Sequence, residues 1–285
     1  MAQQFDPEMH RQMGVEADVV LRVGMLLMGA GTSGYRVLRG MKRSARALGF
    51  DHLDATVGLT QITCTFHRGE YFRTVIARQH SPAVDASRIE ALEDLTHNRL
   101  YAGITAQELA AMLDTIEHNV KKRWGGLILS FAAAIACAAF AYLNFFPLEA
   151  VGLVALAAFA GQFVRYTVLH RHVHQIGGVI AGGATASIVF FLLTEIFGAL
   201  GSVEPSELSS GFVAAVLFLI PGFPLFSALI DIARFDLDAG IVRLGYAFTV
   251  IFTAAFTVSM VSWLTKLSPD PPAPAQDMPV SYTHL

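Results

Sequence analysis

The chain has 285 residues, of which 54% are hydrophobic and only 15% charged, and its mean hydropathy is +0.50. This composition excludes an ordinary soluble domain, and a formal net charge of -3 gives no basis for nucleic-acid binding. The apolar residues gather late in the chain, since no lysine occurs between Lys122 and Lys266. The sequence therefore predicts a polar N-terminal domain followed by a membrane domain.

The first part, residues 1–120, is predicted to be an α+β domain. Four helices are expected, at residues 7–31, 34–49, 86–100 and from 105 onward. Apolar residues that alternate with threonines predict a hairpin between residues 57 and 78, with a bulge near Gln61. The last helix opens with Thr105 and Glu108, which have the spacing of a capping box.

The segment GAGTSG, residues 29–34, matches the G-x-G-x-x-G pattern of dinucleotide-binding folds. Such a fold needs a buried strand before the motif and an acidic residue that closes a second strand. Here Arg22 interrupts the preceding apolar run, and a hairpin follows instead of a crossover. We therefore interpret these small residues as a helix junction that packs closely against the hairpin, and not as a nucleotide site.

The second part, residues 121–266, is predicted to be an α-helical multispan membrane domain. A bilayer core about 30 Å thick needs roughly 20 apolar residues of helix. Five segments meet this requirement, at residues 124–146, 150–169, 177–200, 208–233 and 240–264. Residues 267–285 are expected to form a disordered, proline-rich tail, whose last six residues, VSYTHL, resemble a translated sequencing-adapter fragment.

Basic residues predict the direction of the spans. They lie before the first span, beside the second connection at Arg165 and Arg171, and beside the fourth connection at Arg234 and Arg243. Positively charged loops stay in the cytoplasm, and these three sites alternate along the chain. We therefore expect a multi-pass membrane protein with a cytoplasmic N-terminus and an external C-terminus. The first residues lack a charged segment followed by an apolar run, so no cleavable signal peptide is expected.

The fourth span contains both a break and an acid, in the segment LFLIPGFPLFSALID that ends at Asp231. Pro221, Gly222 and Pro224 should open the helix. Unwound backbone at membrane depth is tolerated where protein or a water-filled cavity receives it, and transporter sites use such helix ends. We expect these residues and Asp231 to line a solute or ion pathway. The alternatives are a simple kink and an interfacial Asp231 that pairs with Arg234.

Other ionisable residues lie in or near the spans. Glu195 is the deepest acid, and it either contributes to a proton or solute pathway or reaches water at the outer end of its helix. His170, His172 and His174 do not have the pattern of a metal site, because only the first and last share a helix face. A basic loop that touches anionic lipid is the preferred interpretation.

Taken together, these features resemble the bacterial threonine/serine exporter family, from about residue 17 to residue 264. The resemblance rests on the runs LRVGMLLMGAGTSGYRV and ITCTFHRGEYFRTVIAR, on the spacing between Arg88 and Ile116, and above all on LIPGFPLFSALIDIARFDLDAGIVR. The positions that match the family pattern in this last run are Pro221, Gly222, Pro224, Asp231, Asp236, Gly240 and Arg243. Phe235 stands where a glycine is often found.

The resemblance implies export of a small polar metabolite across the bacterial inner membrane. The metabolite is threonine or serine for some members and a dicarboxylate such as succinate for others. It also implies a separate, smaller four-span subunit as partner, leaves oligomerisation open, and adds Asp236 and Arg243 to the pathway residues. The residues leave both solute classes open. An ammonium group can pair with Asp231, whereas helix ends with Arg165 or Arg243 suit a dicarboxylate.

A membrane-anchored hydrolase and a non-catalytic membrane scaffold that use the N-terminal domain are the alternatives. The hydrolase lacks support, because Ser33, His52, Cys64 and His67 do not have the spacing of a known triad or nucleophile elbow. The sequence also lacks a G-x-x-x-x-G-K-[ST] phosphate loop. We therefore expect a gradient-driven transporter that is not an enzyme and that uses no cofactor or metal.

Overall fold

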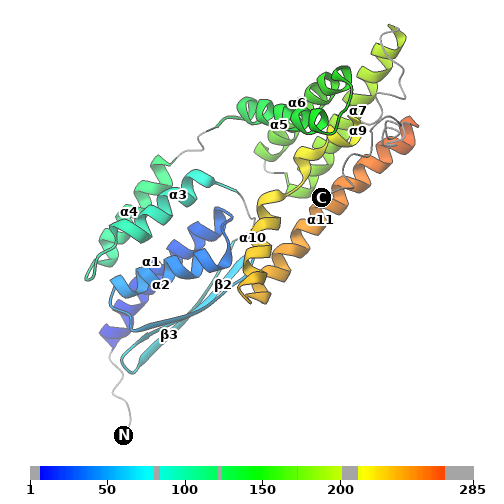
Figure 1. Cartoon of the computed structure of the whole chain (residues 1–285). Helices are drawn as coiled ribbons and strands as arrows, with labels where there is room; N and C mark the ends of the chain where they lie inside the picture. Colours follow the sequence, from blue (N-terminus) through cyan, green and yellow to red (C-terminus); the bar gives the residue numbers. More distant parts are fainter. Residues whose placement is uncertain (1–6, 80–83, 121–123, 172, 201–210, 267–285) are drawn as a thin grey trace, which may run out of the picture. The chain divides into compact units, whose positions relative to one another are not determined.

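The computed structural model describes residues 7–79, 84–120, 124–171, 173–200 and 211–266. Two compact units divide the chain: the first contains residues 1–123 together with 222–247, and the second contains 124–221 together with 248–285. Helices dominate both units, and a three-stranded sheet lies in the first (Figure 1). Residues 222–247 thus pack with N-terminal residues, although the domain boundaries predicted at residues 120 and 266 stay a prediction.

Two helices cover one face of the sheet in the first unit. Helix α1 (Pro7–Gly29) contacts β2 and β3, and helix α2 (Gly34–Ala47) contacts β1 (Figure 1). Val20 and Leu27 of α1 and Met41 of α2 are fully buried between these layers. The helical spacing of the apolar residues therefore produces both predicted helices and directs their apolar faces to one core.

The sheet has one more strand than the sequence predicts. Its antiparallel strands follow chain order and are β1 (His52–Val57), β2 (Gln61–Arg68) and β3 (Tyr71–Arg78). The predicted bulge near Gln61 is wrong, because Gln61 pairs regularly with Arg78 while Val57 pairs with Ile62. A turn separates these strands, and in it the amide of Gly58 donates to the carbonyl of Gln61 at 2.8 Å. The alternation of apolar and polar residues continues through this turn, so the sequence pattern does not reveal the turn.

The remaining helices of the N-terminal part complete the core. Helix α3 (Ala86–Asp94) continues directly into the π-helical turn η1 (Leu95–Arg99), and helix α4 (Ala106–Asn119) follows. The capping box is confirmed, because the amide of Glu108 donates to Oγ1 of Thr105 and the amide of Thr105 donates to Oε2 of Glu108. Both helices contact α1, so they enclose the core on the side away from the sheet.

The first unit also contains a helical hairpin from late in the chain. Helix α10 (Gly222–Ala233) is followed after a short turn by helix α11 (Leu237–Thr265), of which residues up to Ala247 belong to this unit. Gly240 allows the two helices to approach, since an added Cβ would lie 3.0 Å from the backbone nitrogen of Ile232 and 3.2 Å from the carbonyl oxygen of Ala228. The hairpin therefore depends on a missing side chain.

The second unit is a bundle of apolar helices with small residues at its contacts. Its elements are α5 (Gly126–Leu143), α6 (Leu148–His170), α7 (Gln175–Ala199), α9 (Gly211–Ala214), η2 (Leu217–Leu219) and the rest of α11. Helix α6 contacts both α5 and α7. A Cβ added at Gly161 would lie 2.7 Å from the carbonyl oxygen of Gly182, so α6 and α7 meet backbone to backbone. Such contacts are typical of membrane helices.

Among the described residues, four helices are long and apolar enough to cross a membrane, namely α5, α6, α7 and α11. The pieces α9–η2 and α10 form a bent pair that supplies a fifth span if they cross together. Between them, Ile220 is extended, with φ -63° and ψ 123°. The break expected around Pro221 is therefore present, and the count of five spans stays a prediction. The tail, residues 267–285, lies outside the described residues.

Candidate functional site

Asp231, the acid that follows the break, is completely buried in the first unit. Its Oδ2 accepts a hydrogen bond of 3.1 Å from the backbone N–H of Gly34 and lies 3.2 Å from Nε of Arg243. The alternative in which Asp231 pairs with Arg234 is wrong. The guanidinium of Arg234 lies over the ring of Tyr35 instead, 3.8 Å from its centroid.

Arg243 reaches the same cluster from α11. Its side chain is only 5% exposed, and its Nη1 donates a hydrogen bond of 2.7 Å to the carbonyl oxygen of Thr32. Burying two charges costs several kcal/mol per ion, so a buried ion pair is weak evidence for stability. Charged groups within membrane helices more often mark a pathway for solute, ions or protons. The pair Asp231–Arg243 is therefore the candidate site.

The α1–α2 turn, residues 30–33, brings backbone groups to this pair. Helix α2 begins after Ser33, whose side chain makes no capping hydrogen bond. The first N–H groups of a helix have no partner within the helix, and they carry partial positive charge. Here the partner of these N–H groups is the carboxylate of Asp231, which lies 197 positions after Gly34 in the sequence. The same carboxylate also faces the amide of Tyr35. The sequence does not predict this role for Asp231.

Gly34 lets the end of α2 approach the helical hairpin. A Cβ added there would lie 3.2 Å from Cβ of Ala239 and 3.3 Å from Oδ2 of Asp236, which is tighter than ordinary van der Waals contact. The interpretation of GAGTSG as a junction packed against the β-hairpin is therefore wrong for Gly34. It holds for Gly29, which lies against Gln79 next to the end of β3. The small residues in the sequence indicate a close contact at this turn, but they do not indicate which element makes that contact.

The turn between α10 and α11 holds the second predicted acid. Oδ1 of Asp236 accepts a hydrogen bond of 3.3 Å from the amide of Ala239, as an N-cap does. The preceding residue, Phe235, has a φ of 61°. Glycine adopts this left-handed conformation without the steric cost that a Cβ brings. A phenylalanine at this glycine-favouring position therefore keeps the turn but places it under strain.

The other predicted pathway residues belong to the break, to the first turn of α10 and to the second unit. Pro221 and Gly222 are at the break itself, and Pro224 is in the first turn of α10, where a missing N–H leaves no helical hydrogen bond unmade. Glu195 belongs to the second unit, where it is exposed in the last turns of α7. Their roles in a pathway stay a prediction.

The connection between α6 and α7 carries the histidines that the sequence analysis considered. His170 is the last residue of α6, and Nδ1 of His174 accepts a hydrogen bond of 3.3 Å from the amide of Ile176 at the start of α7. His172 lies outside the described residues. In the part of the chain that the structure describes, no group of three or more histidine, cysteine or acidic residues is placed to hold a metal ion.

The buried ion pair keeps unused hydrogen-bonding capacity. Within the described ranges, Oδ1 of Asp231 and both Nε and Nη2 of Arg243 have no hydrogen-bond partner, although Nε is in ion-pair contact with Oδ2 of Asp231. Buried polar atoms are normally satisfied, so each exception calls for an explanation. One carboxylate oxygen and two guanidinium nitrogens without hydrogen bonds, in a single buried cluster, are suited to receive a polar solute.

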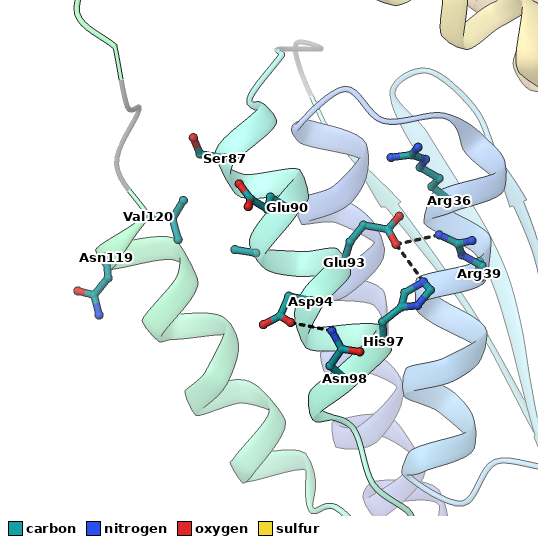
Figure 2. Close-up of a pocket in the computed structure, with 11 residues that line it drawn as sticks. Arg36, Arg39, Ser87, Glu90, Glu93, Asp94, His97, Asn98, Asn119 and Val120 are labelled. Carbon is teal, nitrogen blue, oxygen red and sulfur yellow. Dashed lines mark hydrogen bonds and ion pairs between the residues drawn. The ribbon is translucent and has the colours of Figure 1, made fainter.

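A polar hollow of about 880 Å³ lies elsewhere in the first unit, between α2, α3, η1 and the end of α4 (Figure 2). Oε2 of Glu93 lies 2.8 Å from Nη2 of Arg39 and 3.2 Å from Nε2 of His97, and Asn98 donates to Asp94 at 2.9 Å. These side chains compensate one another's charges, so the hollow gives no specific indication of a ligand.

Of the residues considered for a hydrolase, the two histidines lie side by side, but Ser33 and Cys64 do not join them. Cys64 points into the core, and burial raises the pKa of its thiol to about 12, so the unreactive thiol form prevails at neutral pH. His52 and His67 lie on the other face of the sheet, where Nε2 of His52 is 2.8 Å from Oδ1 of Asp54. Ser33 is buried at the start of α2.

Comparison with known proteins covers both units of the chain. The family model of the threonine/serine exporters (ThrE) matches residues 18–265. The "Probable succinate transporter subunit YjjP" of Escherichia coli (strain K12) is 23% identical over 251 residues, which cover 86% of this chain and 92% of that protein. The protein of the same name from Klebsiella aerogenes is 22% identical over 226 residues, covering 78% and 83%. No solved structure matches this chain.

Proposed function

Because this chain belongs to the threonine/serine exporter family, we propose that it is one subunit of a secondary exporter for a small polar metabolite. It is a multi-pass membrane protein with an export role. The family description favours threonine or serine as the solute, and the names of the relatives favour succinate. The exporter acts in the inner membrane, with the N-terminus in the cytoplasm and the C-terminus outside.

The buried pair Asp231–Arg243 is the observation that carries this proposal. It lies on the hairpin that directly follows the break at Pro221, within helices that otherwise consist mainly of apolar residues. A charged pair that only stabilised the fold would be replaced by apolar side chains at little cost. We assign the pair to the pathway of the solute, together with the broken backbone around Pro221, Gly222 and Pro224.

The proposed exporter has two kinds of subunit. The relatives in Escherichia coli and Klebsiella aerogenes are both named as subunits of a succinate transporter. We propose that this chain likewise assembles with a separate, smaller membrane protein of four spans. The N-terminal part would then be the cytoplasmic domain of the assembly, and its α1–α2 turn would hold the charged pair.

Efflux from cells tests the proposal. Cells that express this chain with and without a four-span partner are loaded with threonine, serine or succinate, and the loss of each solute is followed. We expect efflux of at least one solute with both subunits. The substitution Asp231→Asn should reduce that efflux at least about tenfold, which corresponds to ~1.4 kcal/mol.

The matched control is Asp238→Asn, an exposed aspartate in the first turn of α11 on the same hairpin. It should leave efflux unchanged at an equal amount of protein in the membrane. If Asp231→Asn transports as well as the unmodified chain, the charged pair is not part of the pathway. If none of the three solutes leaves the cells although both subunits are in the membrane, the proposed substrates are wrong.

A further inference from the structure

We propose that the N-terminus of α2 and Arg243 together form a carboxylate-binding site, which Asp231 fills in this structure and which the carboxylate of the exported solute takes over when Asp231 leaves. The second half of this inference rests on the proposed function. The first half is a statement about the chain itself and is testable without transport.

The N-terminus of α2 supplies the first donors of the site. Helix α2 has 14 residues, and its first turn contains no acidic side chain. The amide of Gly34 points to the carboxylate at 3.1 Å, and the amide of Tyr35 faces the same group. Helix N-termini bind carboxylates and phosphates because their free amides and the helix dipole both favour negative charge.

Arg243 is the independent observation that points to a ligand. Its side chain is almost fully buried, and it makes one hydrogen bond to Thr32 through Nη1 and one contact to Asp231 through Nε. Within the described residues Nη2 has no partner, and Nε has the contact to Asp231 but no hydrogen bond. A guanidinium presents a planar set of donors that matches both oxygens of a carboxylate. The site therefore offers more donors than Asp231 uses.

Asp231 occupies the site incompletely. Its Oδ2 makes both contacts, while Oδ1 has no hydrogen-bond partner among the described residues. Oδ2 of the neighbouring Asp236 lies near Gly34 as well, so a second anion would meet two negative charges. A free carboxylate can then enter only by exchange with Asp231. Because of this competition, the apparent affinity for the ligand equals the intrinsic affinity multiplied by the fraction of molecules in which Asp231 has left the site.

The chemistry of the site fixes the class of ligand and not its source. Any small carboxylate that can present two oxygens to Arg243 and the α2 N-terminus fits, and amino acids and dicarboxylates share this group. Oδ1 of Asp231 has no hydrogen-bond partner among the described residues. After displacement, the carboxylate of Asp231 is available to an ammonium group, which an amino acid has and succinate lacks. The experiment must therefore compare both.

The test uses the purified full-length chain in detergent, with Asp231→Ala to empty the site. Formate and acetate are added, with chloride at the same ionic strength as reference, and the thermal unfolding midpoint is measured. We expect acetate to raise the midpoint of Asp231→Ala by about 2–4 °C or more, since a ligand that binds only the folded state stabilises it. The unmodified chain, whose site is filled, should respond much less.

Two variants separate this site from general anion effects. Adding Arg243→Gln to Asp231→Ala should abolish the shift, because it removes the guanidinium. Asp238→Ala, an exposed aspartate on the same hairpin, should respond as the unmodified chain does. If Asp231→Ala does not give folded protein, Asp231→Asn removes the competing charge at nearly constant size, and the same shift is expected. The absence of a carboxylate-specific shift in both Asp231 variants would overturn the inference.

Threonine, threonine amide, succinate and succinamide then identify the source of the carboxylate. A shift with threonine but not its amide supports an amino acid, and a shift with succinate but not succinamide supports a dicarboxylate. A shift with acetate alone would overturn the part that concerns the solute. Because these shifts are measured on purified protein, they separate a failure of this site from a failure of export in cells.

Discussion

The two units bury different kinds of side chain. In the first unit the core of the N-terminal elements contains large residues such as Met13, Leu27 and Phe66. In the second unit the buried positions include Phe190 and Phe212, but most are small residues such as Ala157 and Ser187, and many large apolar side chains are exposed. One chain therefore follows two packing rules.

The surroundings explain this difference. Water drives large apolar side chains into a core, because their removal from water is the main favourable contribution to folding. Lipid does not, since its tails are as apolar as leucine, and membrane helices gain instead from close contact between small residues. The first unit should thus be sensitive to the loss of large side chains, and the second to the enlargement of small ones.

The largest expected effect is the removal of a large side chain from the first unit. Phe66 is fully buried, and its ring lies 4.9 Å from that of Phe50. We expect Phe66→Ala to lower the free energy of unfolding by about 3–5 kcal/mol, because it leaves a cavity. Hydrogen exchange of the β2 and β3 amides measures this. Ile76→Ala, on the exposed face of β3, should change stability by no more than about 0.5 kcal/mol.

The reverse change tests the second unit. A valine at Gly161 would press against the backbone of Gly182, so Gly161→Val should destabilise the unit by about 1–3 kcal/mol or more. The control is Gly152→Val on the same helix, where an added Cβ meets nothing within 4 Å. The amount of monodisperse protein recovered from membranes, with its thermal midpoint, is the measurement. Equal losses in both variants would contradict a packing rule based on small residues.

The smallest expected effect concerns backbone strain, and it compares the stability lost to one strained residue in each unit. Phe235 in the first and Phe145 in the second both have a φ of 61°. Phe235→Gly should raise stability by up to about 1 kcal/mol, because it removes the Cβ clash, and Phe235→Ala should not. We expect a smaller gain for Phe145→Gly if its exposed ring contacts lipid. The thermal unfolding midpoints of the purified variants measure these differences. A lower midpoint for Phe235→Gly than for the unmodified chain would contradict the claim that Phe235 is strained.

Local patterns account for most of the fold. Helical spacing gives α1 and α2, the capping box gives the start of α4, and apolar length gives α5, α6, α7 and α11. The strand β1 was missed, because the alternation continues from Val57 to Leu59 across a turn and reads as one strand. A tight turn without a strong turn motif leaves the apolar period intact, so the period alone could not reveal it.

The site was predictable only in part. Asp231 follows from the cost of an acid in an apolar helix next to a break, and Arg243 and Asp236 were chosen through resemblance to a family. That Asp231 caps α2 could not be predicted, since nothing in the segment around Gly34 specifies an acid 197 positions later. Such a contact is a result of tertiary packing, and only three-dimensional geometry distinguishes Arg243 from the nearer Arg234 as the partner of Asp231.

The hydrogen bond from Gly34 to Asp231 also orders events during synthesis. Ribosomes add about 5–20 residues per second, so Gly34 is made roughly 10–40 s before the residue that caps its helix. During that interval the first turn of α2 has no carboxylate and the carbonyl of Thr32 has no guanidinium. The N-terminal fold is therefore completed only after α10 and the start of α11 have emerged from the ribosome. Its completion thus depends on the correct placement of these later helices.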